Sequence, residues 1–339
     1  MKILFFRESE VKNLNPEIIK TQGFGATETS FILLAERLGK THDVKVCCPC
    51  SQHRYYNHVE YIPLNSYIQV ITILNIFQPD VFIVVGNPQI LFEHHFHAKK
   101  IVFWQQNHPF EMVRYPIQTL LQRSIKIVLP SIEAADYAKE YYGSSDLIYG
   151  IYNGVREEFF ITRDKVPNKI VYSGSLTRVK GVLELLKIHG QLNYDITICG
   201  SFAMYGYEDE EYKTICTQIL NNDTDIKFLG SLGPTKLAEE LASAELCVVN
   251  PIIGNNETCC VSALESMAAK TCVIAGGNSV IDPIILKGGV AYKHNLADQI
   301  DELMSNVAKR NELALNGYNW VKNLMYNSIA KQWDGILND

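Results

Sequence analysis

Short apolar runs rich in β-forming residues alternate along this chain with stretches whose apolar residues have helical spacing. This alternation is typical of parallel sheets covered by helices on both faces. The runs are almost continuously apolar, which indicates strands buried on both sides. The clearest of them lie at residues 80–86, 100–104 and 126–131, and then at 169–175, 194–200, 225–232, 245–251 and 271–277. We therefore predict an α/β fold.

The stretch between these two series of strands has the character of an interdomain connection, with turn residues Asn153 and Gly154 followed by mixed charges. At 339 residues the chain is long enough for two domains of ordinary size. We predict two facing Rossmann-like domains with parallel sheets, at residues 1–154 and 155–317. In the final segment, residues 318–339, the spacing of the apolar residues predicts a helix with one apolar face.

The composition excludes several classes of protein. An apolar fraction of 47% and a charged fraction of 20% are typical of a soluble globular chain. A formal net charge of -6, without a long Lys/Arg run, argues against nucleic acid as a partner. The chain becomes charged at Arg7 and Glu8, too soon for a secretory signal, and no window is long and apolar enough to span a membrane. We expect a cytoplasmic protein.

Nine cysteines is an odd number, and most of them lie in apolar runs, where a free thiol behaves as a small hydrophobe. We expect them to be reduced core residues. A metal site at Cys47, Cys48 and Cys50 would need a matching Cys or His pair at zinc-site spacing, and no such pair follows.

The most informative segment is 250–277, where a strand ends in a loop, the loop enters a helix, and the next strand ends in paired glycines. Ligands of open α/β sheets bind at such carboxyl ends. Backbone N–H groups from Thr258 to Val261 would be unpaired at the helix start, where they suit a diphosphate. Glu257 in the loop and Glu265 on the second helical turn could accept hydrogen bonds from sugar or ribose hydroxyls. They could equally be solvated residues that complement the helix dipole.

A second feature is the segment 173–181, SGSLTRVKG, in which a strand enters a glycine-flanked turn at the start of a helix. The turn carries Arg178 and Lys180, and cations at such a place can clamp phosphate oxygens. The alternative is a pair of solvated turn charges. A second anion site in the same domain favours the phosphate interpretation.

These segments together resemble the large family four of retaining glycosyltransferases, which has the two-domain GT-B fold. The family's two glutamates separated by seven residues, followed by a small-residue helix, are matched by residues 257–277. The family has an Asn-Gly-Val sequence at the entry to its second domain, and residues 153–155 match it. The family also has a Lys-Gly pair whose Lys lies six residues after another glycine, and here Gly174 and Lys180 have this spacing. The family commonly has Arg directly after that glycine, whereas this chain has Ser175 there and offers Arg178 instead.

The resemblance implies transfer of a sugar, with retention of configuration, from a nucleoside diphosphate sugar to an acceptor hydroxyl. It assigns the donor to residues 155–317 and the acceptor to residues 1–154, with the helix at 318–339 crossing back to the first domain. It also places His108 opposite the donor sugar, although a loop histidine bonded to backbone groups would look the same. The glycine-rich stretch 22–39 resembles a loop of the family that approaches the donor phosphate, or it is simply a structural turn.

The residues expected to bind the donor therefore lie in the glycine-rich loop, at carboxyl strand ends and at the helix start. They are Gly23, Gly25, Ser175, Arg178, Lys180, Gly200, Leu232, Glu257, Thr258, Cys259, Cys260, Val261 and Glu265. By resemblance, the catalytic residues are His108, Glu257, Arg178 and Lys180.

We expect neither a metal nor a cofactor, with the nucleoside diphosphate sugar as a co-substrate. The triplet Asp223, Thr224 and Asp225 precedes a predicted strand instead of ending one, so it indicates a turn and not a metal site. The stretch with His94, His95 and His97 is treated as solvated. Cationic side chains and the helix N-terminus then meet the leaving-group charge.

Two other functions share the same donor recognition: a GT-B sugar-nucleotide epimerase or hydrolase, and a non-catalytic sugar-nucleotide-binding protein. A nicotinamide-dependent dehydrogenase is disfavoured because Glu28 stands where the third glycine of the dinucleotide fingerprint would be. The acceptor could be a glycan, a lipid-linked sugar or a small molecule. Membrane contact is expected to be peripheral at most, because no strongly basic amphipathic helix is evident.

Overall fold

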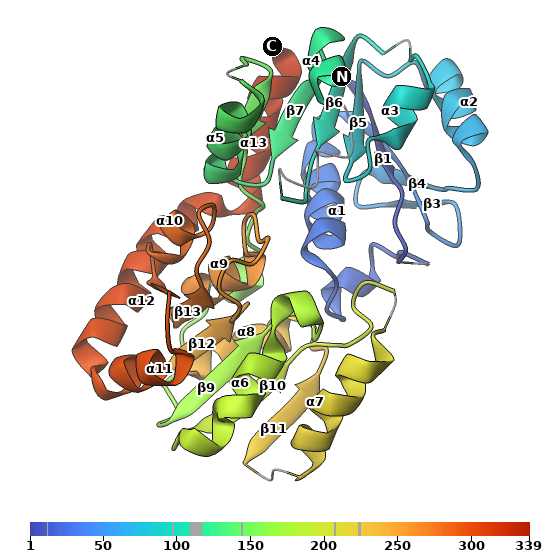
Figure 1. The fold of residues 1–339 in the computed structure, drawn as a ribbon. Coiled ribbons are helices and arrows are strands. Elements are labelled where there is room, and N and C mark those ends of the chain that lie inside the picture. The colour runs from blue at the N-terminus through green and yellow to red at the C-terminus, as the bar shows by residue number, and fades with distance from the viewer. Residues whose placement is uncertain (12, 97, 109–116, 144, 207, 223–224) are drawn as a thin grey trace. The chain divides into compact units, whose positions relative to one another are not determined.

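The computed structural model describes the chain from Met1 to Asp339 except for residues 12, 97, 109–116, 144, 207 and 223–224. The chain divides into two compact units. The first unit contains Met1–Pro16, Ala26–Gly154 and Tyr326–Asp339, and the second contains Glu17–Gly25 and Val155–Met325. Each unit is built around one sheet with helices packed on it, which confirms the predicted α/β class (Figure 1).

The first unit has a sheet in the order β3-β4-β2-β1-β5-β6-β7-β8, in which only the β3–β4 pair is antiparallel. Its central strand β1 pairs in parallel with β2 on one side and β5 on the other. The strands are β1 (Lys2–Arg7), β2 (Asp43–Cys48), β3 (Arg54–Tyr56), β4 (Val59–Pro63), β5 (Val81–Val85), β6 (Lys100–Trp104), β7 (Lys126–Leu129) and β8 (Ile148–Gly150). The helices are α1 (Ala26–Leu38), α2 (Tyr67–Phe77), α3 (Gln89–Glu93), α4 (Ile117–Gln122), α5 (Ile132–Tyr142) and α13 (Tyr326–Asn338).

Burial explains why these apolar runs form the central strands. All five residues of β5 are buried, as expected for a strand covered on both faces. The last helix of the chain, α13, completes this core, because Trp333 is fully buried and packs edge-on against Trp104 with ring centroids 4.8 Å apart. The helix C-terminus is held by Lys100 and Lys126, which donate to the carbonyls of Leu337 and Ile336, each at 2.8 Å.

The second unit has an entirely parallel sheet in the order β11-β10-β9-β12-β13-β14. Its strands are β9 (Lys169–Ser173), β10 (Asp195–Cys199), β11 (Ile226–Gly230), β12 (Leu246–Val249), β13 (Cys272–Gly276) and β14 (Gly289–Tyr292). The α-helices are α6 (Val182–Ile188), α7 (Glu210–Asn222), α8 (Pro234–Ser243), α9 (Val261–Ala268), α10 (Asp282–Ile285), α11 (Leu296–Ser305) and α12 (Val307–Val321). Short 3₁₀ helices include η1 (Ile18–Lys20), η3 (Glu157–Phe159), η4 (Arg178–Lys180), η5 (His189–Gln191) and η6 (Lys322–Leu324).

The structure differs from the predicted C-terminal helix at residues 318–339. Helix α12 ends at Val321, η6 follows, and α13 begins at Tyr326. Met325 has extended backbone angles and forms a parallel bridge with Val155, whose N–H also donates to Leu324 O at 2.8 Å. This pairing interrupts the helix, because an extended residue cannot continue the i to i−4 hydrogen bonds.

A second difference concerns Glu17–Gly25, which lie within the predicted first domain but pack with the second unit. Arg156 donates to the carbonyl of Ile19 at 2.7 Å, and Ser231 donates to the carbonyl of Gly23 at 3.4 Å.

In the described part of the chain, no helix is both long and apolar enough to cross a membrane.

Candidate functional site

The order of strands in the second unit defines where a ligand would bind. The chain runs outward from β9 through β10 to β11, and then returns to start β12 on the other side of β9. The connections after β9 and β12 therefore diverge at a topological switch point, where open α/β sheets bind their ligands. Residues 174–181 follow β9, and residues 250–260 follow β12, so both informative segments of the sequence begin there.

At this switch point the structure brings Lys180 and Glu257 together. The Lys180 ammonium and the Asn250 amide both donate to Oε2 of Glu257. The two charged side chains are only 21% and 16% exposed, so burial alone would favour their neutral forms. The ion pair outweighs that desolvation: the pKa of Glu257 is lowered, and the pKa of Lys180 is raised. Both groups therefore stay charged at neutral pH.

Helix α9 begins beside this pair, with Thr258, Cys259 and Cys260 buried in the approach to it. Cys260 occupies the cap position with left-handed backbone angles, φ 53° and ψ 65°, and its side chain makes no capping hydrogen bond in the described structure. A left-handed conformation costs a non-glycine residue about 1–2 kcal/mol. Strain of this kind gathers at functional sites, where N–H groups without a side-chain cap can bind an anion.

The loop before α9 is held by two asparagines that the sequence analysis did not single out. Asn255 donates to the carbonyls of Ile252 and Gly276 at 2.7 and 2.9 Å. Asn278 donates to the Asn255 carbonyl at 2.8 Å and accepts from two backbone N–H groups at 2.7 and 2.8 Å. Their positions in the loops that follow strands β12 and β13 are the signal that could have found them, since asparagine favours turns.

Arg178 is not brought to the Lys180–Glu257 pair in this structure. Its guanidinium donates to Asp209 at 2.6 Å and to Glu211 at 2.5 Å, and lies 5.3 Å from the ring centroid of Tyr212. All three partners lie just before or within the first turn of α7. The sequence analysis missed both acids, because ion-pair partners some thirty residues apart leave no local pattern.

Glu265 lies on the second turn of α9 and is partly buried. Burial raises the pKa of its carboxyl to about 7, although the charge of Arg156 acts to lower it and that of Glu158 to raise it. A carboxyl with this pKa changes its charge near neutral pH. It can accept hydrogen bonds as a carboxylate or donate one as an acid.

The remaining donor-site candidates lie in closely packed parts of the second unit, where a side chain at Gly23 or Gly200 would collide with neighbouring atoms. A Cβ at Gly23 would lie 2.6 Å from Ser231 Oγ and 2.9 Å from Leu232 O, and Gly25 is buried in the same loop. A Cβ at Gly200 would lie 1.9 Å from the carbonyl oxygen of Gly174. Ser175 is 2% exposed, with its hydroxyl 3.4 Å from that of Thr177.

His108 lies in the first unit, after β6, and is only 4% exposed. Its ring packs at 62° to that of Tyr137, with centroids 5.3 Å apart. Burial lowers the pKa of this imidazole, so His108 is neutral at pH 7. Two residues before His108, the Gln106 side chain accepts a hydrogen bond from the Asn153 amide at 3.0 Å. This bond joins the loop after β6 to the end of the segment Ala26–Gly154.

Several sequence features lie wholly or partly outside the described residues: His97, and Asp223 and Thr224 of the DxD triplet. Among the residues that are described, no group of three or more His, Cys, Asp or Glu side chains is placed to hold a metal ion.

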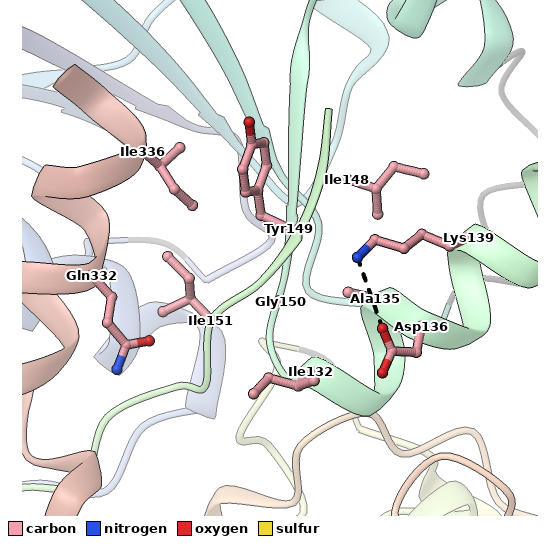
Figure 2. Close-up of a pocket in the computed structure, with 10 residues that line it drawn as sticks. All are labelled: Ile132, Ala135, Asp136, Lys139, Ile148, Tyr149, Gly150, Ile151, Gln332 and Ile336. Carbon is pink, nitrogen blue, oxygen red and sulfur yellow. Dashed lines mark ion pairs between the residues drawn. The ribbon is translucent and has the colours of Figure 1, made fainter. Parts of the chain in front are cut away.

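The first unit also contains a cavity of about 450 Å³, between α5, β8 and α13. Figure 2 shows side chains of α5 and α13 on opposite sides of β8, with Asp136 and Lys139 forming an ion pair at 3.8 Å. In Figure 1 the red helix α13 lies beside the green α5. The residues that line this cavity include none of the predicted site residues, so it is separate from the candidate donor site.

Comparison with known proteins matches the part of the chain that contains this site to a family model. Residues 155–320 match the family model for glycosyl transferases group 1. No match to the chain was found among curated proteins.

Solved structures are similar over the whole chain. A sucrose-phosphate synthase from Thermosynechococcus elongatus has 16% identity and a TM-score of 0.78, with 100% of this chain and 98% of that chain covered. Anabaena Alr3699/HepE in complex with UDP-glucose has 15% identity and a TM-score of 0.74, with 100% and 99% covered. A glycosyltransferase from Rickettsia africae has 15% identity and a TM-score of 0.72, with 99% and 97% covered.

The shared fold confirms the predicted GT-B architecture with two Rossmann-like domains. The matched domain assigns the chain to the glycosyltransferases as a class of enzyme. Within that class, the match is to the group 1 family, and it covers the part of the second unit in which Lys180, Glu257 and α9 meet.

Proposed function

We propose that this chain is a retaining glycosyltransferase of family four that moves a sugar from a nucleoside diphosphate sugar to an acceptor hydroxyl. The observation that carries the proposal is the buried Lys180–Glu257 ion pair beside the start of α9, at the switch point of the second sheet. A fixed cation and the N-terminus of a helix suit a diphosphate, and a carboxylate suits the hydroxyls of a sugar.

In this proposal the second unit binds the donor. Lys180 and the N-terminus of α9 meet the charge that develops on the departing diphosphate, without a metal ion. Glu265 accepts hydrogen bonds from ribose, and Glu257 orients both Lys180 and the donor sugar. Arg178 contributes by exchanging Asp209 and Glu211 for a phosphate oxygen, which is feasible because its side chain is 47% exposed.

The first unit then binds the acceptor, and His108 acts on the transferred sugar as a neutral imidazole. The acceptor is a carbohydrate, free or lipid-linked, with peripheral membrane contact at most. We also propose that the protein acts in the cytoplasm, because all nine cysteines are buried and free, as is usual in a reducing compartment.

Calorimetric titration with a panel of nucleoside diphosphates and their sugars tests donor recognition. UDP and UDP-glucose come first, since HepE is seen with UDP-glucose. We expect saturable binding by the wild type, and binding weakened by about tenfold or more in Lys180→Met and Glu257→Gln. A chain that binds no nucleotide of the panel would refute the donor site.

Product analysis separates the proposal from its rivals. A transferase produces a new glycoside whose anomeric configuration, read by NMR, matches that of the donor. An epimerase would produce a new sugar nucleotide, a hydrolase a free sugar, and a non-catalytic binding protein no product at all.

A further inference from the structure

The first sheet has a switch point of its own, which the donor site does not use. The loops after β1 and β5 leave neighbouring strands in opposite directions. Six polar side chains gather where these loops begin, and none of them was assigned a role above. We call Arg7, Glu8, Ser9, Glu28, Tyr67 and Asn87 the β1–β5 polar cluster.

One half of the cluster is a neutral pair. Arg7, the last residue of β1, donates to Oε1 of Glu28 at 2.8 Å, and Ser9 donates to the same oxygen at 2.9 Å. Glu28 is 3% exposed, and Arg7 also donates to the carbonyl of Val85 at 3.3 Å. A Cβ at Gly86 would lie 2.1 Å from Arg7 Nη1, so the absence of a side chain there lets Arg7 reach its partners. The Arg7 charge is thereby cancelled by a buried carboxylate.

The other half is an uncompensated carboxylate. Glu8 accepts from the Tyr67 hydroxyl at 2.7 Å and from the Asn87 amide at 3.0 Å, and both bonds go to Oε2. Among the described residues, Oε1 of Glu8 accepts no hydrogen bond, and the side chain is partly exposed. Both partners of Glu8 are uncharged. Counting Arg7, Glu8 and Glu28, the cluster therefore has a net charge of about −1 at neutral pH.

We propose that Glu8 and Asn87 select an uncharged, hydroxyl-rich acceptor and that Glu8 disfavours a phosphorylated one. An open carboxylate oxygen accepts hydrogen bonds from sugar hydroxyls, whereas a phosphate brought to the same place meets a like charge. The Arg7 guanidinium does not rescue phosphate binding, because Glu28 already neutralises it. This inference rests on the proposed function, since it names the acceptor class of the same enzyme.

The test uses the whole chain and methyl glycosides of glucose, mannose and galactose, each paired with its 6-phosphate. Ligand-observed NMR, with and without UDP, measures acceptor binding, and UDP-sugar turnover measures transfer. We expect the wild type to bind at least one glycoside about tenfold or more tightly than its phosphate. Glu8→Gln should weaken glycoside binding about tenfold and reduce the discrimination against phosphate.

Two further variants make the result specific. Asn87→Ala should weaken glycoside binding while preserving the discrimination against phosphate, because Glu8 keeps its charge. If Glu8→Gln does not fold, the loss of glycoside binding in Asn87→Ala still tests whether the cluster binds the acceptor. Glu133→Gln is the matched control, since Glu133 likewise accepts from a tyrosine, Tyr152 at 2.8 and 2.9 Å, but lies outside the cluster. It should behave as the wild type, and UDP affinity should stay unchanged in all three variants.

Equal or tighter binding of the phosphates by the wild type overturns the inference, and so does the absence of binding by every glycoside. Unaltered glycoside binding in both Glu8→Gln and Asn87→Ala overturns it as well, and so does unaltered discrimination against phosphate in Glu8→Gln. The proposed function fails separately, by the loss of nucleotide binding or by the absence of glycoside product with any donor and acceptor.

Discussion

The Lys180–Glu257 pair shows how single residues set the chemistry of the candidate donor site. Burial alone shifts the pKa of each side chain toward its neutral form, and the interaction with the other side chain reverses that shift. Removing one partner of such a pair leaves an uncompensated charge, at a cost of about 3–5 kcal/mol in buried examples. We therefore expect the loss of either residue to affect both folding and binding, so donor affinity must be measured on folded variants.

Glu265 gives a prediction of pH dependence. Because burial raises the pKa of its carboxyl to about 7, Glu265 is increasingly protonated below that pH. If ribose hydroxyls bind the carboxylate, donor affinity should rise as pH increases through about 7 and level off above it, with a slope approaching tenfold per pH unit on the acid side. Calorimetric titration across this range measures the effect.

Glu265→Gln removes the titrating group. Above the pKa the variant should bind the donor more weakly by about 1–3 kcal/mol, and its affinity should no longer follow pH through this region. Wild-type affinity that stays constant from about pH 6 to pH 8 would remove Glu265 from the donor site.

His108 gives a second prediction, on rate. The residues proposed to bind the donor lie in the second unit, so His108→Ala should leave donor Kd nearly unchanged while kcat falls by roughly tenfold to a thousandfold. The ring is 4% exposed and packs on Tyr137, so some stability is lost as well, and His108→Gln checks whether packing explains the result. Wild-type kcat in a folded His108→Ala variant would show that the residue is structural.

At the scale of elements, the sequence was most informative where burial is complete. The apolar runs at 80–86, 100–104 and 245–251 contain β5, β6 and β12, because strands covered on both faces must be continuously apolar. The short, partly exposed strand β3 has no such pattern, since exposed residues need not be apolar. The analysis did not single it out, and only its antiparallel pairing with β4 defines it.

The candidate site could be predicted only in part, because sequence patterns report on neighbouring residues and not on contacts between distant segments. Local spacing predicted a helix start after Glu257 and cations after β9, because both depend on neighbours in the sequence. The partners of those residues depend on the sheet. The carboxylates that bind Arg178, the packing of Glu17–Gly25 with the second unit and the Asn255–Asn278 contact all join distant segments. The assignment of donor and acceptor to the two units remains a prediction.

A glycine at the end of β10 yields a prediction at this scale. In Gly200→Ala, the new methyl would meet the carbonyl of Gly174 at 1.9 Å, a contact with backbone that cannot rotate away. Strand β10 and the loop after β9 must then separate, which should cost about 1–3 kcal/mol or more and weaken donor binding. Gly190→Ala is the control, because nothing lies within 4 Å of its Cβ position.

Chemical denaturation and nucleotide titration of the two glycine variants give the comparison. If Gly200→Ala matches Gly190→Ala in both stability and nucleotide affinity, the close approach of β10 to this loop does not support the site.

At the scale of the whole molecule, the absence of a metal requirement is a prediction about turnover. Lys180 and the start of α9 are proposed to carry the charge that a metal ion carries in other transferases. We therefore expect activity to survive EDTA. Loss of turnover on chelation, with recovery on adding Mn²⁺ or Mg²⁺, would contradict this and direct attention to residues 223–225.

The two units give the last prediction, because each has its own sheet and core and the proposed function assigns a different substrate to each. UDP at a hundredfold excess over its Kd should stabilise the protein by about 2.7 kcal/mol, since the nucleotide binds only the folded state. Hydrogen exchange should locate that effect: with UDP bound, amides of residues 174–181 and 250–261 should exchange more slowly. The loops after β1 and β5, which carry Glu8 and Asn87, should exchange at the same rate with and without UDP. Protection by UDP that appears in those two loops and is missing from residues 174–181 and 250–261 would reverse the proposed assignment of donor and acceptor.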